Sequence, residues 1–203
     1  MPTVAPTLAF TAARAAAPSP PRTDGRATPA DAFDEAYATF RRGERVDMQE
    51  LAARLGVSRA TLYRWTGDRE RLLADVAWVS ADTLFTWTER FEGEGADLIV
   101  DRADGFMRVI AADPALQAFL ENERDLALRV LTRRGVGVQD RSLARLTQEL
   151  EEMVARGEYA PRLPVPLLAM AIVRTVQAFV YGDLIVGLEP DLTGARDVIR
   201  ALL

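Results

Sequence analysis

The residues best suited to chemistry lie in a short basic segment, residues 54–71. This segment holds five arginines and two acidic residues, with Ser58, Thr61 and Tyr63 among them. Guanidinium and hydroxyl groups donate hydrogen bonds to phosphate oxygens and to base edges. The whole chain carries a net charge of −5, so the basic segment stands out against an acidic background. The pattern indicates binding of nucleic acid.

The composition removes most of the side chains that enzymes use. The 203 residues include no histidine and no cysteine, and all 25 basic residues are arginine. A histidine general base, a thiolate nucleophile or metal ligand, and a Schiff-base lysine are therefore excluded. We predict a binding protein rather than an enzyme, with no metal and no cofactor.

A helical enzyme that uses carboxylates is one alternative. Asp97, Asp101 and Asp104 fall on one face of a predicted helix. An acidic helix face in contact with solvent is the simpler explanation of this spacing, and no histidine is present to assist catalysis.

The basic segment and the residues before it have the spacing of a helix-turn-helix. Ala52 is small enough to lie where two helices cross, and Gly56 suits a left-handed turn between them. Ser58 caps the second helix, and Leu62 packs that helix back onto the first. In this motif the outer face and N-terminal half of the second helix enter the major groove of DNA. The predicted contacts from this helix are Ser58, Arg59, Thr61, Tyr63 and Arg64.

The remainder of the chain also has helical periodicity, so the predicted fold class is all-α. We expect a flexible Ala/Pro-rich tail over 1–28, a helix-turn-helix DNA-binding domain over 29–75, and a larger helical ligand-binding and dimerisation domain over 76–203. The first helix should start at Thr28-Pro29. The later helices are expected over 96–112, 115–134 (kinked or split), 139–156, 165–187 and 191–203.

Two features of the C-terminal part predict partners. Its aromatic residues, with uncharged polar groups between them, indicate one pocket for a small apolar or amphipathic effector. The helix over 165–187 has an apolar stripe wider than one partner requires, so we expect a homodimer through 165–203. The residues predicted to form the pocket are Trp87, Phe91, Phe106, Phe119, Asn122, Gln177 and Tyr181.

The location expected from the sequence is the cytoplasm. The N-terminus lacks the basic region of a signal peptide. No stretch has 18 or more apolar residues with few or no charges, because Asp183 interrupts the best candidate, Val176 to Val186. We therefore expect no membrane partner.

The segment 56–63, Gly-Val-Ser-Arg-Ala-Thr-Leu-Tyr, together with Asp-Arg-Glu-Arg-Leu-Leu over 68–73, resembles the TetR family of transcriptional regulators. The resemblance covers about residues 32–75. It implies a three-helix DNA-binding domain, an all-helical effector domain and a homodimer that binds double-stranded operator DNA. It further implies that Tyr63 contacts a phosphate and that Arg69, where the family usually has a lysine, also meets the DNA backbone. The function implied is that of a repressor released by a small molecule.

Two departures from the family pattern lie at the end of the helix-turn-helix. Trp65-Thr66 stands in place of the usual His-Phe pair, and Gly67 in place of the common proline. Trp65 is therefore either a core residue or a DNA contact. The string over 64–69, Arg-Trp-Thr-Gly-Asp-Arg, is similar to the QsdR-like subgroup, which is linked to quorum-sensing lactone metabolism.

Another class of helix-turn-helix protein offers a second alternative. The string over 55–64 also resembles the motif of serine recombinases. Those enzymes place the motif after a catalytic domain, whereas only a Pro-rich tail and one short helix precede it here. The order of segments therefore favours the regulator.

Overall fold

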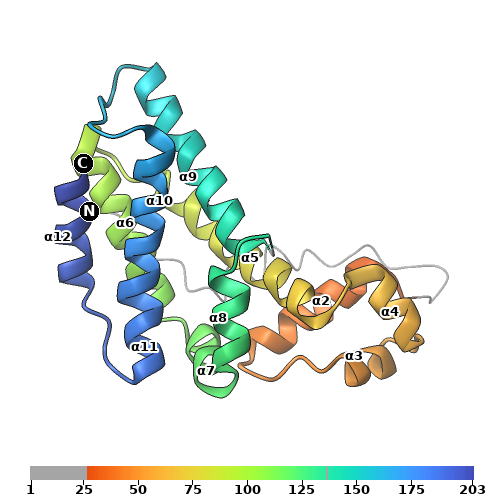
Figure 1. Ribbon diagram of the computed structural model, residues 1–203. Helices are drawn as coiled ribbons and strands as arrows, with labels where there is room; N and C mark the ends of the chain where they lie inside the picture. Colours follow the sequence, from red (N-terminus) through yellow and green to blue (C-terminus); the bar gives the residue numbers. More distant parts are fainter. Residues whose placement is uncertain (1–26, 136) are drawn as a thin grey trace.

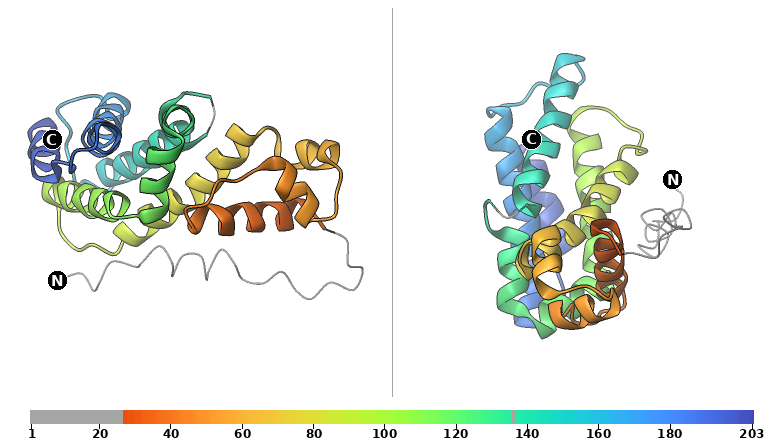
Figure 2. Two further views of the ribbon diagram at one scale, coloured as in Figure 1. Left: turned by 90° about the horizontal axis from the view of Figure 1, so that it is seen from below. Right: turned by 90° about the vertical axis from the view of Figure 1, so that its right-hand side faces the viewer.

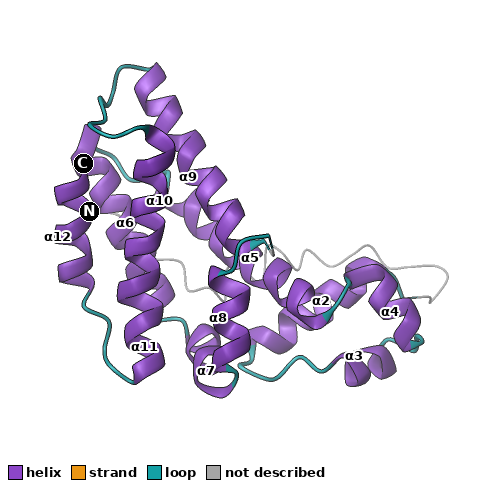
Figure 3. Cartoon of the chain, in the orientation of Figure 1, coloured by secondary structure: helices purple, strands orange, loops and turns teal. Residues whose placement is uncertain are grey.

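The computed structural model describes residues 27–135 and 137–203. The tail predicted over 1–28 lies outside the described residues except for its last two. All regular structure in the described ranges is helical, which confirms the all-α prediction (Figures 1 and 3). The helices are α2 (Pro29–Arg41), α3 (Met48–Arg54), α4 (Arg59–Thr66), α5 (Arg69–Thr88), α6 (Gly95–Ala111), α7 (Pro114–Asn122), α8 (Arg124–Thr132), α9 (Val138–Ala155), α10 (Val165–Val176), the π-helix η1 (Gln177–Gly182), α11 (Asp183–Val186) and α12 (Leu192–Leu202).

The first four helices begin where polar side chains cap them. Thr28 and Asp31 form a reciprocal capping box at the start of α2. Asp47 accepts hydrogen bonds from two backbone N–H groups at the start of α3, and those bonds, led by that of Glu50, lower the pKa of Asp47. Ser58 and Asp68 cap α4 and α5 in the same way. Local capping chemistry therefore fixes where each helix starts.

Two glycines set the directions of the chain around α4. Gly56, between α3 and α4, has φ +64°, and Gly67, between α4 and α5, has φ +72° with ψ −151°. Side chains with a Cβ rarely adopt either conformation, and the second is open essentially to glycine alone. The helix α4 is consequently short, and it meets both neighbours at sharp turns.

Helices α2, α3 and α4 form a small unit at one end of the molecule (Figures 1 and 2). Leu62 of α4 is completely buried, and Ala52 of α3 and Phe40 of α2 belong to the same core. Trp65 is half-buried against the same core. The structure thus gives Trp65 a packing role.

The long helix α5 runs from this unit into the rest of the molecule (Figure 2). It packs on α2 and α4 and also on α6, α8 and α9. It continues without a break through residues 75 and 76, where the sequence analysis placed a domain boundary. Both predicted domains therefore share one helix, and the division between them remains a prediction.

The apolar helix near the C-terminus is continuous from Val165 to Val186 and contains the π-helical turn η1. This helix has 22 residues, and an 18-residue window of it has a mean hydropathy of 1.5, which by length and composition alone suffices to span a membrane. The sequence analysis expected no membrane-length apolar stretch, and by this average that expectation was wrong, because an 18-residue window tolerates a charged residue such as Arg174. In the fold, this helix packs against α9 and α12.

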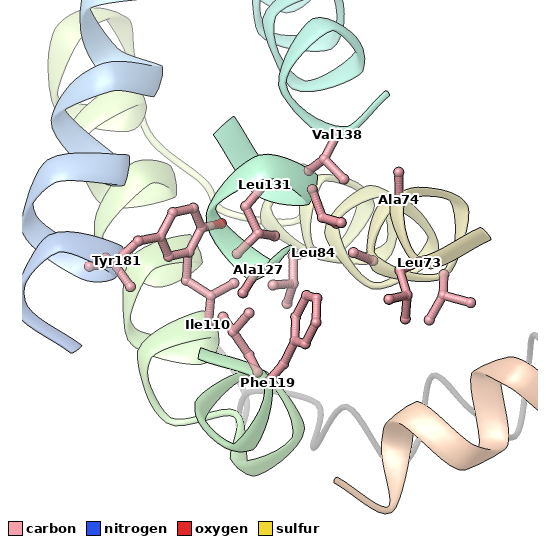
Figure 4. Close-up of a cluster of buried hydrophobic side chains, with 14 of the residues drawn as sticks. Leu73, Ala74, Leu84, Ile110, Phe119, Ala127, Leu131, Val138 and Tyr181 are labelled. Atoms are coloured by element: carbon pink, nitrogen blue, oxygen red, sulfur yellow. The ribbon is translucent and has the colours of Figure 1, made fainter. Parts of the chain in front are cut away.

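The segment predicted over 115–134 is split into α7 and α8 at Glu123, whose backbone (φ −137°, ψ 44°) is not helical. Side chains from both helices enter a buried cluster between α5, α6 and the C-terminal helices (Figure 4). Phe119 of α7, Leu131 of α8 and Tyr181 of η1 belong to it. The cluster therefore joins α7 and α8 to α5, α6 and the C-terminal helices.

Candidate nucleic-acid interface and internal cavity

The helix α4 presents most of the predicted DNA contacts to solvent. Arg59, Tyr63 and Arg64 are exposed, with Tyr63 at 41%. Within residues 27–135 and 137–203, neither Arg59 nor Arg64 has an ion-pair partner. Two guanidinium groups and one phenol are therefore available together on one short helix, and Arg59 lies at its N-terminus, where backbone N–H groups favour an anion.

Ser58 and Thr61 form hydrogen bonds with each other at the start of α4. The Ser58 hydroxyl accepts a hydrogen bond from the Thr61 backbone N–H at 3.1 Å. The two hydroxyl oxygens lie 2.9 Å apart, within hydrogen-bond distance. Both groups therefore stabilise the start of α4, and each keeps further hydrogen-bonding capacity for a phosphate.

Arg69 differs from the residues of α4. Its guanidinium donates to a carboxylate oxygen of Glu123 at 2.7 Å and to the Val46 carbonyl at 2.5 Å. The Arg69 and Glu123 side chains are only 19% and 17% exposed. The structure thus places Arg69 at a junction between α5, the loop before α3 and the α7–α8 turn, rather than on the open surface of α4.

A partly open cavity of about 80 Å³ lies among α5, α6, α8, α9, α10 and η1. Most of its lining is apolar. Of the residues predicted for an effector pocket, Phe106, Gln177 and Tyr181 line it. Side chains that the sequence analysis did not single out complete the wall, among them Phe85, Leu131, Leu146, Ile172, Arg102 and Glu149.

The other four predicted pocket residues do not line this cavity. Trp87 and Phe91 pack on each other edge to face, with ring centroids 4.9 Å apart. Phe119 makes an edge contact with Phe40 of α2 at 5.5 Å. Asn122 is exposed, and with Phe119 it lines a separate hollow beside the loop between α2 and α3. The positions of these four residues in the sequence do not show that they lie outside the cavity.

The polar groups of the cavity are few. Arg102 and Glu149 form an ion pair with each other across α6 and α9. Gln177 donates to the Leu131 carbonyl at 3.4 Å and accepts from Arg174 at 3.2 Å. The Tyr181 hydroxyl has no hydrogen-bond partner among the described residues, and burial raises its pKa to about 12. A ligand in this cavity would therefore meet an apolar wall with Tyr181 as a neutral hydrogen-bond donor.

Residues 94–203, more than half of the chain, match the family described as "Tetracyclin repressor-like, C-terminal domain". The chain belongs to the TetR family. The transcriptional repressor QsdR from R. erythropolis, a TetR-family protein of solved structure, resembles it with a TM-score of 0.79 and 28% identity. That alignment covers 86% of this chain and 93% of QsdR. No curated protein sequence matches the chain.

These findings confirm the resemblance drawn from residues 56–73, including its QsdR-like character. As a member of the TetR family, the chain is a DNA-binding transcriptional regulator. The family match covers the C-terminal part, whereas the helix-turn-helix signal lies in the N-terminal part. Two independent parts of the sequence thus lead to the same family.

Proposed function

We propose that the protein is a homodimeric repressor that binds operator DNA through α4 and releases it when a small apolar or amphipathic molecule occupies the cavity. One observation carries this proposal. The helix α5 begins three residues after the end of α4, and its far end supplies Phe85 and Thr88 to the cavity wall. Occupancy at one end of a single rigid helix therefore bears on the DNA-binding surface at the other.

The proposed contacts with DNA are Ser58, Arg59, Thr61, Tyr63, Arg64 and Arg69. Arg59 and Arg64 are assigned to base edges, because a guanidinium reads guanine with two hydrogen bonds. Tyr63 and Arg69 are assigned to the phosphate backbone. Binding by such contacts falls steeply with salt, because counterions are released from the DNA.

The proposed dimer forms through α10 and α12. Leu167, Met170 and Val198 are large apolar side chains that remain 41–45% exposed on these two helices. A second copy of the chain would cover them and would hold two α4 helices about 34–36 Å apart, one turn of DNA. The proposed location is the cytoplasm, where operator DNA is accessible.

A carboxylate enzyme is not favoured by the structure. Asp97 and Asp101 of α6 form ion pairs with Arg200 and Arg196 of α12. Asp104 pairs with Arg108 on its own helix. The acidic face therefore attaches α12 to α6, and we propose that the protein has no enzymatic activity.

The test combines DNA selection with ligand competition. Random-sequence duplexes carried through rounds of binding should yield a near-palindromic site, and purified protein should bind that site as a dimer. Low-polarity compounds that raise the thermal unfolding temperature should then release the DNA, because linkage requires equal effects in both directions. Binding without sequence preference, or stabilising compounds that leave DNA affinity unchanged, would contradict the proposal.

A further inference from the structure

The Arg69–Glu123 ion pair is the feature that the proposed function leaves unexplained. Both carboxylate oxygens of Glu123 are engaged by the Arg69 guanidinium, at 2.7 and 2.6 Å. A third contact, to the Val46 carbonyl, fixes the same group from the other side. Because both side chains are mostly buried, water and salt screen this pair less than they screen an exposed one.

The position of this pair places it beside the DNA-binding surface. Arg69 is the first residue of α5 and lies three residues after the end of α4. Arg45, which is 71% exposed, approaches the same Glu123 carboxylate at 3.8 Å. A phosphate and a carboxylate occupy the same two N–H groups of a guanidinium. Arg69 therefore cannot serve a phosphate fully while Glu123 holds both of these groups.

We propose that Glu123 competes with a DNA phosphate for Arg69 and so lowers the affinity of the protein for DNA. Glu123 is a positioning residue that acts through Arg69. This inference rests on the proposed function, because it takes Arg69 to be a backbone contact. It adds a residue outside the helix-turn-helix that sets the strength of DNA binding.

The same ion pair is joined to the cavity by one short helix. Glu123 ends α7 and immediately precedes α8. At the other end of α8, Leu131 lines the cavity, and its carbonyl accepts the hydrogen bond from Gln177. Nine helical residues span about 13 Å. A cavity occupant that displaces Leu131 therefore moves the helix that begins beside Glu123.

The experiment measures binding to a mixed-sequence duplex of roughly 30 base pairs, enough for two half-sites, by fluorescence anisotropy. Glu123→Gln is expected to raise the affinity about fivefold, the effect of removing a favourable ion pair. Glu121→Gln is the matched control, because it makes the same charge change two residues away on an exposed side chain without an ion pair among the described residues. It should leave the affinity nearly unchanged.

A second variant separates competition from general electrostatics. Glu123→Asp keeps the charge but shortens the side chain by one methylene, so it should also raise the affinity. It also carries the test if Glu123→Gln fails to fold, which thermal unfolding would reveal. Equal effects of Glu121→Gln and Glu123→Gln, or an unchanged affinity for Glu123→Asp, would overturn the proposal.

The role of Arg69 itself is tested by a double-variant cycle. Arg69→Ala should reduce the dependence of log affinity on log salt by about 0.9 per subunit, the value for one lost phosphate contact. In the Arg69→Ala background, Glu123→Gln should no longer raise the affinity. If its effect persists there, or if Arg69→Ala leaves the salt dependence unchanged, the proposal is overturned. The proposed function still stands in that case, provided that Arg64→Ala weakens binding; a wild-type protein that binds no duplex would overturn both.

Discussion

Arg41 of α2 donates hydrogen bonds to both carboxylate oxygens of Asp113, at 2.9 and 2.7 Å. Asp113 is only 5% exposed, and it also caps α7 through the Ala115 backbone N–H. One carboxylate therefore starts a helix in the C-terminal part and attaches α2, and with it the unit of α2, α3 and α4, to that part. The contact joins segments that are far apart in the sequence.

Asp113→Ala should lower the free energy of unfolding by about 3 kcal/mol or more, because it leaves a largely buried arginine without its partner and removes a helix cap. Asp113→Asn keeps a cap oxygen and should cost less. The measurement is urea unfolding followed by circular dichroism. The control is Glu44→Ala, which breaks an exposed pair with Arg42 and should not alter the midpoint. If Asp113→Ala left the free energy of unfolding unchanged, the contact between Arg41 and Asp113 would contribute nothing to stability.

Substitutions on α4 should separate contacts that read bases from contacts that position the backbone. Arg59→Ala or Arg64→Ala should lose about 1–3 kcal/mol of preference for particular base pairs. Tyr63→Phe should weaken binding to all sequences alike, since it removes only the proposed phosphate contact. Competition between the selected site and single-base variants measures the difference. If all three variants lost the same affinity on every sequence, the distinction between base-reading and backbone contacts would be wrong.

The dimer should depend on the exposed apolar side chains of α10. Leu167→Glu places a charge on a side chain that is 45% exposed in the single chain, and burying that charge in an interface is costly. Sedimentation should show a shift from dimer to monomer at micromolar concentration. Val154→Glu, on α9 at 38% exposed, is the matched control and should leave the dimer intact. A dimer that survives Leu167→Glu would place the interface elsewhere.

Stability should fall at alkaline pH because of Tyr181. Burial raises the pKa of this phenol from 10 to about 12, so the folded state keeps its proton where the unfolded chain loses it. The stabilisation is complete below pH 10 and is lost as the pH rises towards 12, by about 3 kcal/mol for a shift of this size. Tyr181→Phe should show a smaller decline in unfolding free energy over this range. Burial raises the pKa of Tyr159 as well, so part of the decline remains; identical declines in both proteins would contradict the assignment.

Features that depend on neighbouring residues could be predicted from the sequence. The caps at Thr28 and Ser58 and the turn at Gly56 are local, and the structure has each where the pattern indicates it. The split near Glu123 was expected only as a kink or break somewhere over 115–134, because periodicity shows that a helix ends but not the angle at which the chain continues.

The composition of the cavity could not be predicted in the same way. The sequence places the apolar side chain of Phe119 on a helix. It does not show that Phe119 contacts Phe40 of α2 instead of lining the cavity with Tyr181. The sequence analysis did not single out Arg102, whose ion-pair partner Glu149 lies 47 residues later in the chain. Such pairings depend on how helices pack together, which a single sequence does not specify.

The π-helical turn η1 also determines the phase of the helix that contains it. A π turn holds one residue more than an α turn, so the residues after Gly182 are rotated by about 100° relative to an uninterrupted α-helix. This rotation brings Asp183 to the position where it accepts a hydrogen bond from the Asp191 backbone N–H at 3.1 Å and holds the loop before α12. Deleting any one residue from Gln177–Gly182 would restore a regular helix and turn Asp183 away from that loop. The extra residue of the π turn thus aligns α11 with α12.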